Sequence, residues 1–428
     1  MFCGSELARD SCHSRYASRV TISPSADTAN GADPVVDRAV LALSCAAFGS
    51  GLSQRGMDAL LPSLAAEFSR PLGVVAAVVT CFTLGYALGQ LLFGPLGDRY
   101  GKLRVITASC LACCLGALAC AAAPTLGWLV GARAFAGAVT AAILPLAMAW
   151  IGDVVPYERR QLVLARFLVG QIVGVASGQL LGGLAADYLG RQLPFLGIAA
   201  VFLVSALALA RAQRRLPAEP PPSASLTVHP VRHLFQEFAA VLAEPWPRVV
   251  VLTVFVEGAA VFGALAFFAT HLHHTLGVSL TAAGAMVMAF GGGGTAFSFA
   301  ARKLVPRLGE VGLARGGGWV MLLAIGCVAF APSVPAVVLA CFALGMGFYM
   351  LHNTLQTNAT QMAPQRRGSA VSLFALCYFG GQTVGVALAG AAAAWMGTRG
   401  VILVGMGVVF LVSRLFAYAR EHKLGLTY

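Results

Sequence analysis

Long apolar segments separated by short polar connections recur along the whole chain. They hold about 18 to 24 residues each, enough to cross a hydrocarbon core of about 30 Å at 1.5 Å per residue. Because a helix satisfies its backbone polar groups internally, the pattern predicts spanning helices rather than open sheets. We predict twelve, at roughly 39–61, 73–94, 104–123, 127–149, 163–185, 193–211, 248–270, 280–300, 313–330, 336–358, 369–391 and 400–418.

The composition excludes a water-soluble globular protein. Apolar residues make up 58% of the 428 residues and charged residues only 11%, and the mean hydropathy is +0.79. Soluble domains carry roughly 25% charged residues. A chain this apolar needs lipid around it, so we predict a multi-pass integral membrane protein.

The net charge of +12 reflects topology. With the N-terminus inside, the cytoplasmic connections carry most basic residues: Arg99, Lys102, Arg104, Arg159, Arg160, Arg211, Arg214, Arg215, Arg232, Arg302, Lys303, Arg307, Arg366, Arg367, Arg420 and Lys423. The opposite side carries little more than Arg70, Arg191 and Arg399. The positive-inside rule then places both termini in the cytoplasm. The expected location is a bacterial inner (plasma) membrane. Anionic lipids at that face are the expected partners of the basic loops, and nucleic acid is not.

The polar stretches divide the chain. Residues 1–37 lack the apolar core of a signal peptide and are predicted to be a disordered cytoplasmic tail. We predict a six-helix bundle over 38–211 and a second over 248–418. Between them lies a cytoplasmic linker, 212–247, with a Pro-rich stretch and an amphipathic helix near Val231–Leu242. Residues 419–428 form a second cytoplasmic tail.

The two predicted bundles are related in sequence. An offset of 208 aligns Gly101 with Gly309, Gly137 with Gly345, Pro156 with Pro364, and Arg159 with Arg367. An offset of 211 aligns the segment 170–175 with 381–386. Because the offset spans an even number of helices, the halves share one orientation. The predicted fold is an all-α membrane protein of two parallel six-helix repeats around a central cavity, which is typical of transporters.

The connection after the second predicted helix carries a recognisable motif. It reads Gly94-Pro95-Leu96-Gly97-Asp98-Arg99-Tyr100-Gly101-Lys102 and resembles the signature loop of the major facilitator superfamily. Gly94 and Gly101 are expected to allow a tight turn, with Asp98 among Arg99 and Lys102. The resemblance implies that Asp98 meets the N-terminal end of the eleventh helix and latches one conformation. The second-half copy has Pro306 instead of Asp98, and the alternative is a basic loop that only sets topology.

Two further motifs resemble the drug/proton antiporters of that superfamily. Arg133 precedes Gly137 in the fourth helix, where the resemblance implies a role in proton coupling; alternatively, Arg133 extends outward to the membrane surface. The fifth helix carries glycines four residues apart, which favours close helix packing: Gly170, Gly174, Gly178 and Gly182. In the antiporter motif a proline follows the central glycine, whereas this chain has Gln179.

Carboxylates inside the spans are candidates for proton coupling. Asp58 precedes a Leu-Pro pair at the end of the first helix and can pair with Arg55, three residues earlier. Glu257 lies about nine residues into the seventh helix, roughly 13 Å deep. Burial disfavours the charged form of a lone carboxylate, which suits proton uptake and release. The alternative for Glu257 is a static partner of Arg133 or Arg55.

The tenth helix is unusually polar and supplies candidates for substrate contacts. His352, Asn353 and Gln356 can hydrogen-bond a substrate or a neighbouring helix, and further substrate-cavity candidates are Arg55, Gln90, Gln171 and Gln382. The glycine run 291–294 in the eighth helix predicts either a break or a close-packing site. We expect no metal site and no cofactor.

The family resemblance covers roughly residues 39 to 418. It implies a secondary active transporter, and we predict proton-coupled efflux of a small, partly apolar compound by alternating access. A sugar, nucleoside or metabolite facilitator is the alternative, and a membrane sensor or membrane-embedded enzyme a remote one. No Walker-type phosphate loop occurs in the sequence, so ATP is not the expected energy source. The expected partners are the substrate, protons and the bilayer. The protein is expected to be a monomer and is not expected to be an enzyme.

Overall fold

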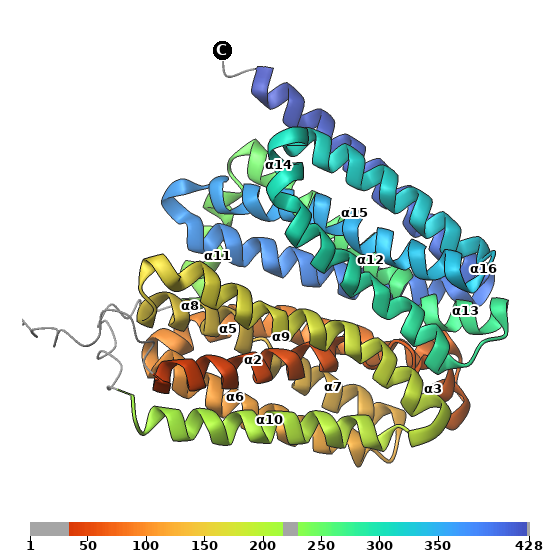
Figure 1. Cartoon of the computed structure of the whole chain (residues 1–428), viewed down its shortest axis with the longest axis horizontal. Coiled ribbons are helices and arrows are strands. Elements are labelled where there is room, and N and C mark those ends of the chain that lie inside the picture. The colour runs from red at the N-terminus through yellow and green to blue at the C-terminus, as the bar shows by residue number, and fades with distance from the viewer. Residues whose placement is uncertain (1–33, 217–229, 426–428) are drawn as a thin grey trace, which may run out of the picture.

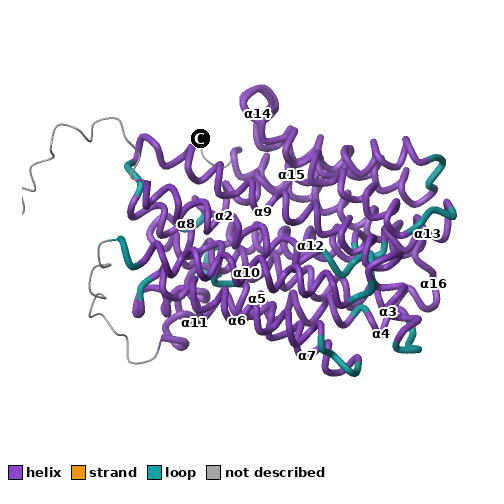
Figure 2. The backbone as a smooth tube through the Cα atoms, turned by 60° about the horizontal axis from the view of Figure 1, so that its bottom comes forward, coloured by secondary structure: helices purple, strands orange, loops and turns teal. Residues whose placement is uncertain are grey.

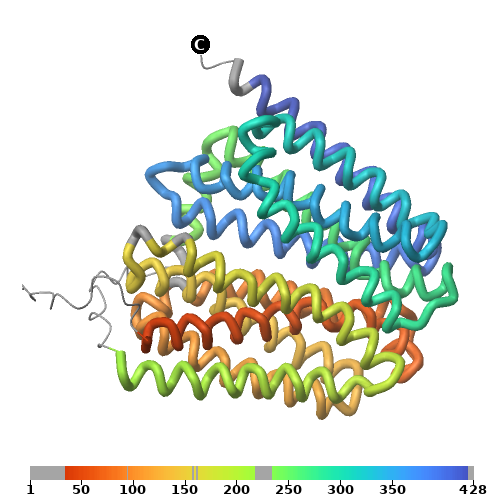
Figure 3. Tube along the Cα trace, in the orientation of Figure 1, coloured from red at the N-terminus to blue at the C-terminus, as the bar shows by residue number. Residues whose placement is uncertain are grey.

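A computed structural model describes residues 34–216 and 230–425. The expectations for 1–33, 217–229 and 426–428 lie outside these ranges. The described chain is all-α and has no strand, as predicted, and Figure 2 shows long helices joined by short loops. Figure 3 follows the chain from the N-terminal half, red to yellow-green, into the C-terminal half, green to blue, which lies beside it.

The N-terminal half contains one long helix for each predicted span, with breaks in the first, second and fourth. Its elements are α2 Pro34–Arg55, α3 Leu61–Glu67, α4 Leu72–Val75, α5 Ala77–Tyr100, α6 Lys102–Ala121, α7 Leu126–Thr140, α8 Ile143–Val154, α9 Tyr157–Leu184, the π-helical turn η1 Ala185–Leu189, and α10 Gln192–Gln213.

The C-terminal half follows the linker helix α11. Its elements are α11 Pro230–Val241, α12 Pro245–Leu265, α13 Phe268–Leu276, α14 Leu280–Phe330, α15 Val334–Gln361, the 3-10 turn η2 Pro364–Arg366, and α16 Arg367–Gly425. Ten helical segments of the described chain are long and apolar enough to cross a membrane. Two of them, α14 and α16, are double-length and turn at Gly309 and Gly397, so the number of spans is twelve.

The backbone itself repeats. Six positions with positive φ form three pairs separated by 207 or 208 residues: Ser69 and Gly277, Gly101 and Gly309, Gly190 and Gly397. In each pair the chain reverses at corresponding points of the two halves. Glycine suits such turns because it has no Cβ to clash at positive φ.

Helix packing repeats as well. A methyl group added to Gly137 would lie 2.0 Å from the carbonyl oxygen of Phe82, and one added to Gly345 would lie 1.9 Å from that of Phe290. Both pairs are related by the offset of 208. Only glycine lets these backbones approach so closely. The glycines that repeat in the sequence therefore make the same helix contact in each half.

One local prediction is wrong, and one of two predicted alternatives is excluded. The chain does not turn at Gly94, because α5 runs through it to Tyr100 and ends at Gly101, where φ is 92°. The run 291–294 is not a break, because α14 stays helical there and departs from helical geometry at Gly309. A methyl group on Gly293 would lie 1.8 Å from the carbonyl oxygen of Phe342, so the run is a packing site.

The halves meet most closely at one end of the bundle. We call it the α3 end, after the helix there, and we call the other end, where α8 and α11 lie, the linker end; Figure 1 shows the halves converging at the first and diverging towards the second. A methyl group on Gly73 would lie 2.3 Å from the carbonyl oxygen of Gly390. The carboxylate of Asp187 accepts hydrogen bonds from the backbone N–H groups of Leu280 and Thr281, at 3.3 and 2.6 Å. These N–H groups form the N-terminus of α14, so Asp187 caps a helix of the opposite half.

Candidate functional site

The first buried polar cluster forms where α2 ends. The helix stops at Arg55, and the turn that follows brings Asp58 back towards it, with Nη1 of Arg55 3.7 Å from Oδ2 of Asp58. Nη2 of Arg55 donates to Oε1 of Gln382 in α16 over 2.7 Å, and Nε2 of Gln179 in α9 donates to Oδ2 of Asp58 over 2.9 Å. Both charged side chains are almost wholly buried. The cluster therefore joins the two halves through one arginine and holds one carboxylate.

The glycine ladder of α9 lets this turn form. Methyl groups added to Gly170, Gly174 and Gly182 would lie 2.3, 2.2 and 2.3 Å from backbone oxygens of Ser44, Phe48 and Gly56, respectively. Gly178 also faces the turn, at 3.1 Å from the nitrogen of Gly56. Because α9 lies directly against α2, Gln179 reaches Asp58.

Arg133 is buried in the N-terminal half. Only 1% of it is exposed, so the alternative in which it extends to the membrane surface is wrong. Its Nε donates to the carbonyl of Val78 over 3.3 Å and its Nη1 to Oγ of Ser53 over 3.2 Å. The guanidinium lies 4.0 Å from the ring centroid of Phe82, a cation–π geometry. Ser53 lies in the last turn of α2, two residues before Arg55, so Arg133 sits next to the Arg55–Asp58 turn.

The second buried polar cluster lies in the C-terminal half. Glu257 of α12 is fully buried, and its Oε2 lies 2.8 Å from Nδ1 of His352 in α15. The side chain of His352 is 13% exposed. Among the described residues, Oε1 of Glu257 has no hydrogen-bond partner. The partner of Glu257 is thus a titratable histidine, and the arginine partners proposed from the sequence are wrong.

Aromatic rings surround these groups and cross between the halves. His352 stacks on Phe348 at 5.0 Å with an interplanar angle of 17°, and it lies 4.7 Å from Tyr378. Tyr86 of α5 lies 4.3 Å from Phe379 of α16. We call the whole set the aromatic cluster: Phe82, Tyr86, Phe262, Phe290, Phe348, Tyr349, Phe374, Tyr378 and Phe379. Arg55 places its guanidinium 4.0 Å from the ring centroid of Phe262, so the cluster touches both polar sites.

The remaining substrate candidates are spread around this centre. Nε2 of Gln171 lies 3.5 Å from Oε1 of Gln54, and Gln90 is within hydrogen-bonding reach of Tyr86. Asn353 is partly buried and Gln356 is exposed, on the linker side of His352. The structure brings Arg55 and Gln382 into direct contact but leaves these other amides apart from them.

The signature segment lies at the linker end. Lys102 pairs with Asp153 of α8 at 2.5 Å, while Asp98 and Arg99 are exposed. At the start of α16 the nearby carboxylate is that of Glu237 in α11 rather than that of Asp98, since Ser369 lies 3.5 Å from it. The contact between Asp98 and the eleventh helix is therefore not made in this conformation.

Comparison with known proteins identifies the family. The sequence model of the Major Facilitator Superfamily matches residues 43–385. The chain belongs to the major facilitator superfamily. The uncharacterized MFS-type transporter YwfA of Bacillus subtilis (strain 168) is 26% identical over 391 residues, which cover 90% of this chain and 93% of YwfA. Multidrug export protein EmrB of Escherichia coli (strain K12) is 27% identical over 147 residues, 34% of this chain and 29% of EmrB.

The fold agrees with this assignment. The crystal structure of the nucleoside transporter NupG has a TM-score of 0.70 and covers 88% of this chain and 98% of its own, at 14% identity. At that identity the likeness concerns the fold alone. This major facilitator protein is thus a multi-pass membrane transporter with a small-molecule substrate.

Several residues of the transporter's centre were not predicted as site residues. Gln179 was noted only as a departure from the antiporter motif, and the Oγ1 contact between Thr83 and Thr383, 3.0 Å across the halves, was not foreseen. Tyr86, Tyr378 and Phe379 were also missed. The offsets of the repeat place residues within a half but carry no information on contacts between halves, so the sequence held no signal for these pairs.

Proposed function

We propose that the protein exports a small, partly apolar compound in exchange for protons. The observation that carries the proposal is the 2.8 Å contact between Glu257 and His352, two titratable groups joined inside the bundle. Titratable residues within spans are costly and usually serve ion or proton pathways. Protonation of Glu257 at Oε1 would remove the uncompensated charge of a buried carboxylate.

His352 is suited to carry the proton to Glu257. Its side chain is partly exposed while Glu257 is fully buried, and exposed Gln356 lies one helical turn further towards the linker end. An imidazole accepts a proton on one nitrogen and releases one from the other. The pathway thus runs from the linker end through His352 to Glu257.

The Arg55–Asp58 cluster couples protonation to movement of the halves. Arg55 is shared between Asp58 in its own half and Gln382 in the other. When Asp58 is protonated, its attraction for Arg55 falls, and the arginine is free to change partners as the halves rock. Arg133 lies beside the same turn and provides a second buried positive charge there.

The orientation follows from the basic connections. Most of them lie at the linker end, so we place this end and both termini in the cytoplasm. The conformation closed at the α3 end is then the inward-facing one. In the outward-facing conformation, Asp98 would approach the N-terminus of the eleventh span and act as the latch. The six-helix bundles 38–211 and 248–418 would rock as units about the linker, in a monomer surrounded by anionic lipid.

The aromatic cluster supports an apolar or aromatic substrate, because ring faces contribute apolar area and stacking. The partial match to a multidrug export protein points the same way. The test is transport in everted membrane vesicles with ethidium as the probe. We expect ATP-independent, proton-driven accumulation that a protonophore abolishes. Accumulation that persists after the proton gradient is collapsed would contradict proton coupling, whereas equilibration of ethidium without accumulation would favour a facilitator.

A further inference from the structure

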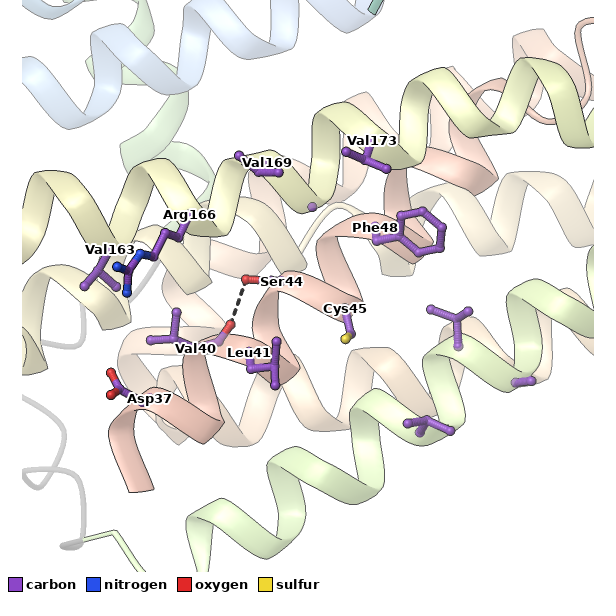
Figure 4. Close-up of a pocket in the computed structure, with 14 residues that line it drawn as sticks. Asp37, Val40, Leu41, Ser44, Cys45, Phe48, Val163, Arg166, Val169 and Val173 are labelled. Atoms are coloured by element: carbon purple, nitrogen blue, oxygen red, sulfur yellow. Dashed lines mark hydrogen bonds between the residues drawn. The ribbon is translucent and has the colours of Figure 1, made fainter. Parts of the chain in front are cut away.

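A long furrow runs along the outer surface of the N-terminal half, away from both polar clusters. Figure 4 shows α2 as its floor, with α9 on one side and α10 on the other. Its volume is about 850 Å³. The walls are almost wholly apolar, formed by valines such as Val169, Val173 and Val204.

The furrow opens outward. Leu41 is 66% exposed, Val169 54% and Val204 62%. These residues belong to spanning helices, so the surface faces the bilayer and its filling must be apolar. An acyl chain meets that requirement.

The furrow has one charged end, near the linker end of the bundle. Asp37 lies in the first turn of α2 and Arg166 in α9, and Figure 4 shows the guanidinium of Arg166 directed towards Val163 and the side on which Asp37 lies. Both side chains are exposed, and they do not form an ion pair with each other. One cation and one anion thus flank the same opening.

We propose that this furrow binds one phospholipid with a primary-amine headgroup. The phosphate lies against Arg166, the ammonium lies against Asp37, and one acyl chain follows α9 from Arg166 to Val173, about 10 Å of helix. A wholly anionic headgroup matches Arg166 but is repelled by Asp37. Zwitterionic charge is therefore the complement of this site, in contrast to the anionic lipid expected at the basic loops. A primary ammonium, unlike a choline group, can also donate a hydrogen bond to the carboxylate of Asp37.

The site belongs to one half only. The positions 211 residues after Asp37 and Arg166 hold Arg248 and Cys377, so the charge pair is not duplicated. One molecule of transporter is expected to hold one such lipid. A lipid in this place rests on α9, the helix that supplies Gln179 to Asp58.

The test uses the full-length protein purified in detergent and titrated with dioleoyl phosphatidylethanolamine, phosphatidylcholine or phosphatidylglycerol, with bound lipid counted by native mass spectrometry. Wild type should retain one phosphatidylethanolamine, about fivefold more strongly than the other two lipids. Asp37→Asn should erase that preference, and Arg166→Gln should weaken all three lipids about fivefold. Val173→Trp should reduce retention irrespective of headgroup, because the indole fills the furrow.

The matched control is Arg211→Gln, which removes one exposed arginine of α10 and should leave retention unchanged. A size-exclusion profile equal to wild type shows that each variant is folded, since all substituted side chains are exposed. Stronger retention of phosphatidylglycerol, or equal retention of phosphatidylcholine, would overturn the assignment of the headgroup. Retention in the three furrow variants equal to that of Arg211→Gln would overturn the site itself.

Discussion

Nε2 of Gln179 donates a hydrogen bond to Oδ2 of Asp58 over 2.9 Å, from α9 to the turn that follows α2. Gln179 stands where the antiporter motif resembled by this helix has proline. A proline has neither an amide side chain nor a backbone N–H to donate. The glutamine that replaces the motif's proline is thus the nearest hydrogen-bond donor to Asp58.

Replacing this glutamine should destabilise the protein. Gln179→Leu leaves Oδ2 of Asp58 with Arg55 alone, at 3.7 Å. Because hydrogen bonds between membrane helices contribute about 1 kcal/mol, we expect a loss of that order and a lower Tm in detergent. Gln171→Leu is the matched control, since the nearest amide partner of Gln171 lies 3.5 Å away. An equal decrease of Tm in both variants would show that the bond to Asp58 contributes nothing specific.

Sequence periodicity was sufficient to predict the spans, the repeat and the burial of Glu257. Apolar runs and glycine spacing are properties of one helix, so they can be read along the chain. The partners of buried charges are different, because Arg55 meets Gln382, 327 residues away, and Glu257 meets His352. Such contacts depend on how the two halves pack against each other. In a single sequence, the only sign of these contacts is a polar or charged residue within an apolar span.

Glu257 offers the sharpest test of proton coupling. Glu257→Gln keeps the size of the side chain and its ability to hydrogen-bond His352 but cannot take up and release a proton. We expect proton-driven ethidium accumulation in everted vesicles to fall at least about tenfold, equivalent to about 1.4 kcal/mol or more. Ethidium exchange without a gradient should persist. Full proton-driven transport by this variant would remove Glu257 from the mechanism.

His352 should affect the pH dependence of transport more than its capacity. In His352→Gln the amide can still hydrogen-bond Glu257, but it cannot take up and release a proton as an imidazole does. If the histidine relays protons, the proton-driven rate should become less dependent on pH while apparent affinity for ethidium stays within about twofold. Rates are to be measured at fixed gradient from pH 5.5 to 8. A profile identical to wild type would indicate that His352 only packs against Phe348.

Asp187 should stabilise the conformation that is closed at the α3 end. Its carboxylate caps the N-terminus of α14 in the opposite half, and Asp187→Asn removes the charge while it keeps an oxygen acceptor. A carboxylate at such a position contributes about 0.3–1 kcal/mol. Hydrogen exchange of backbone amides near Leu280 should therefore rise about two- to fivefold. The control Asp153→Asn breaks only the ion pair with Lys102 inside the N-terminal half, and exchange near Leu280 should not change.

Gly183 of α9 packs against the same N-terminus of α14 that Asp187 caps. A methyl group there would lie 2.3 Å from the carbonyl oxygen of Leu280, so a larger side chain must push α9 and α14 apart. Overpacking of this kind costs about 1–3 kcal/mol, and the strain is relieved when the halves separate at the α3 end. Gly183→Leu should thus favour the alternative conformation, seen as faster hydrogen exchange at residues 279–284 and slower exchange around Asp98 at the linker end. Gly131→Leu, where a Cβ meets nothing within 4 Å, should leave both regions as in wild type. Faster exchange at both ends in Gly183→Leu would mean general loosening instead of rocking, and the two-state movement of the halves would have to be abandoned.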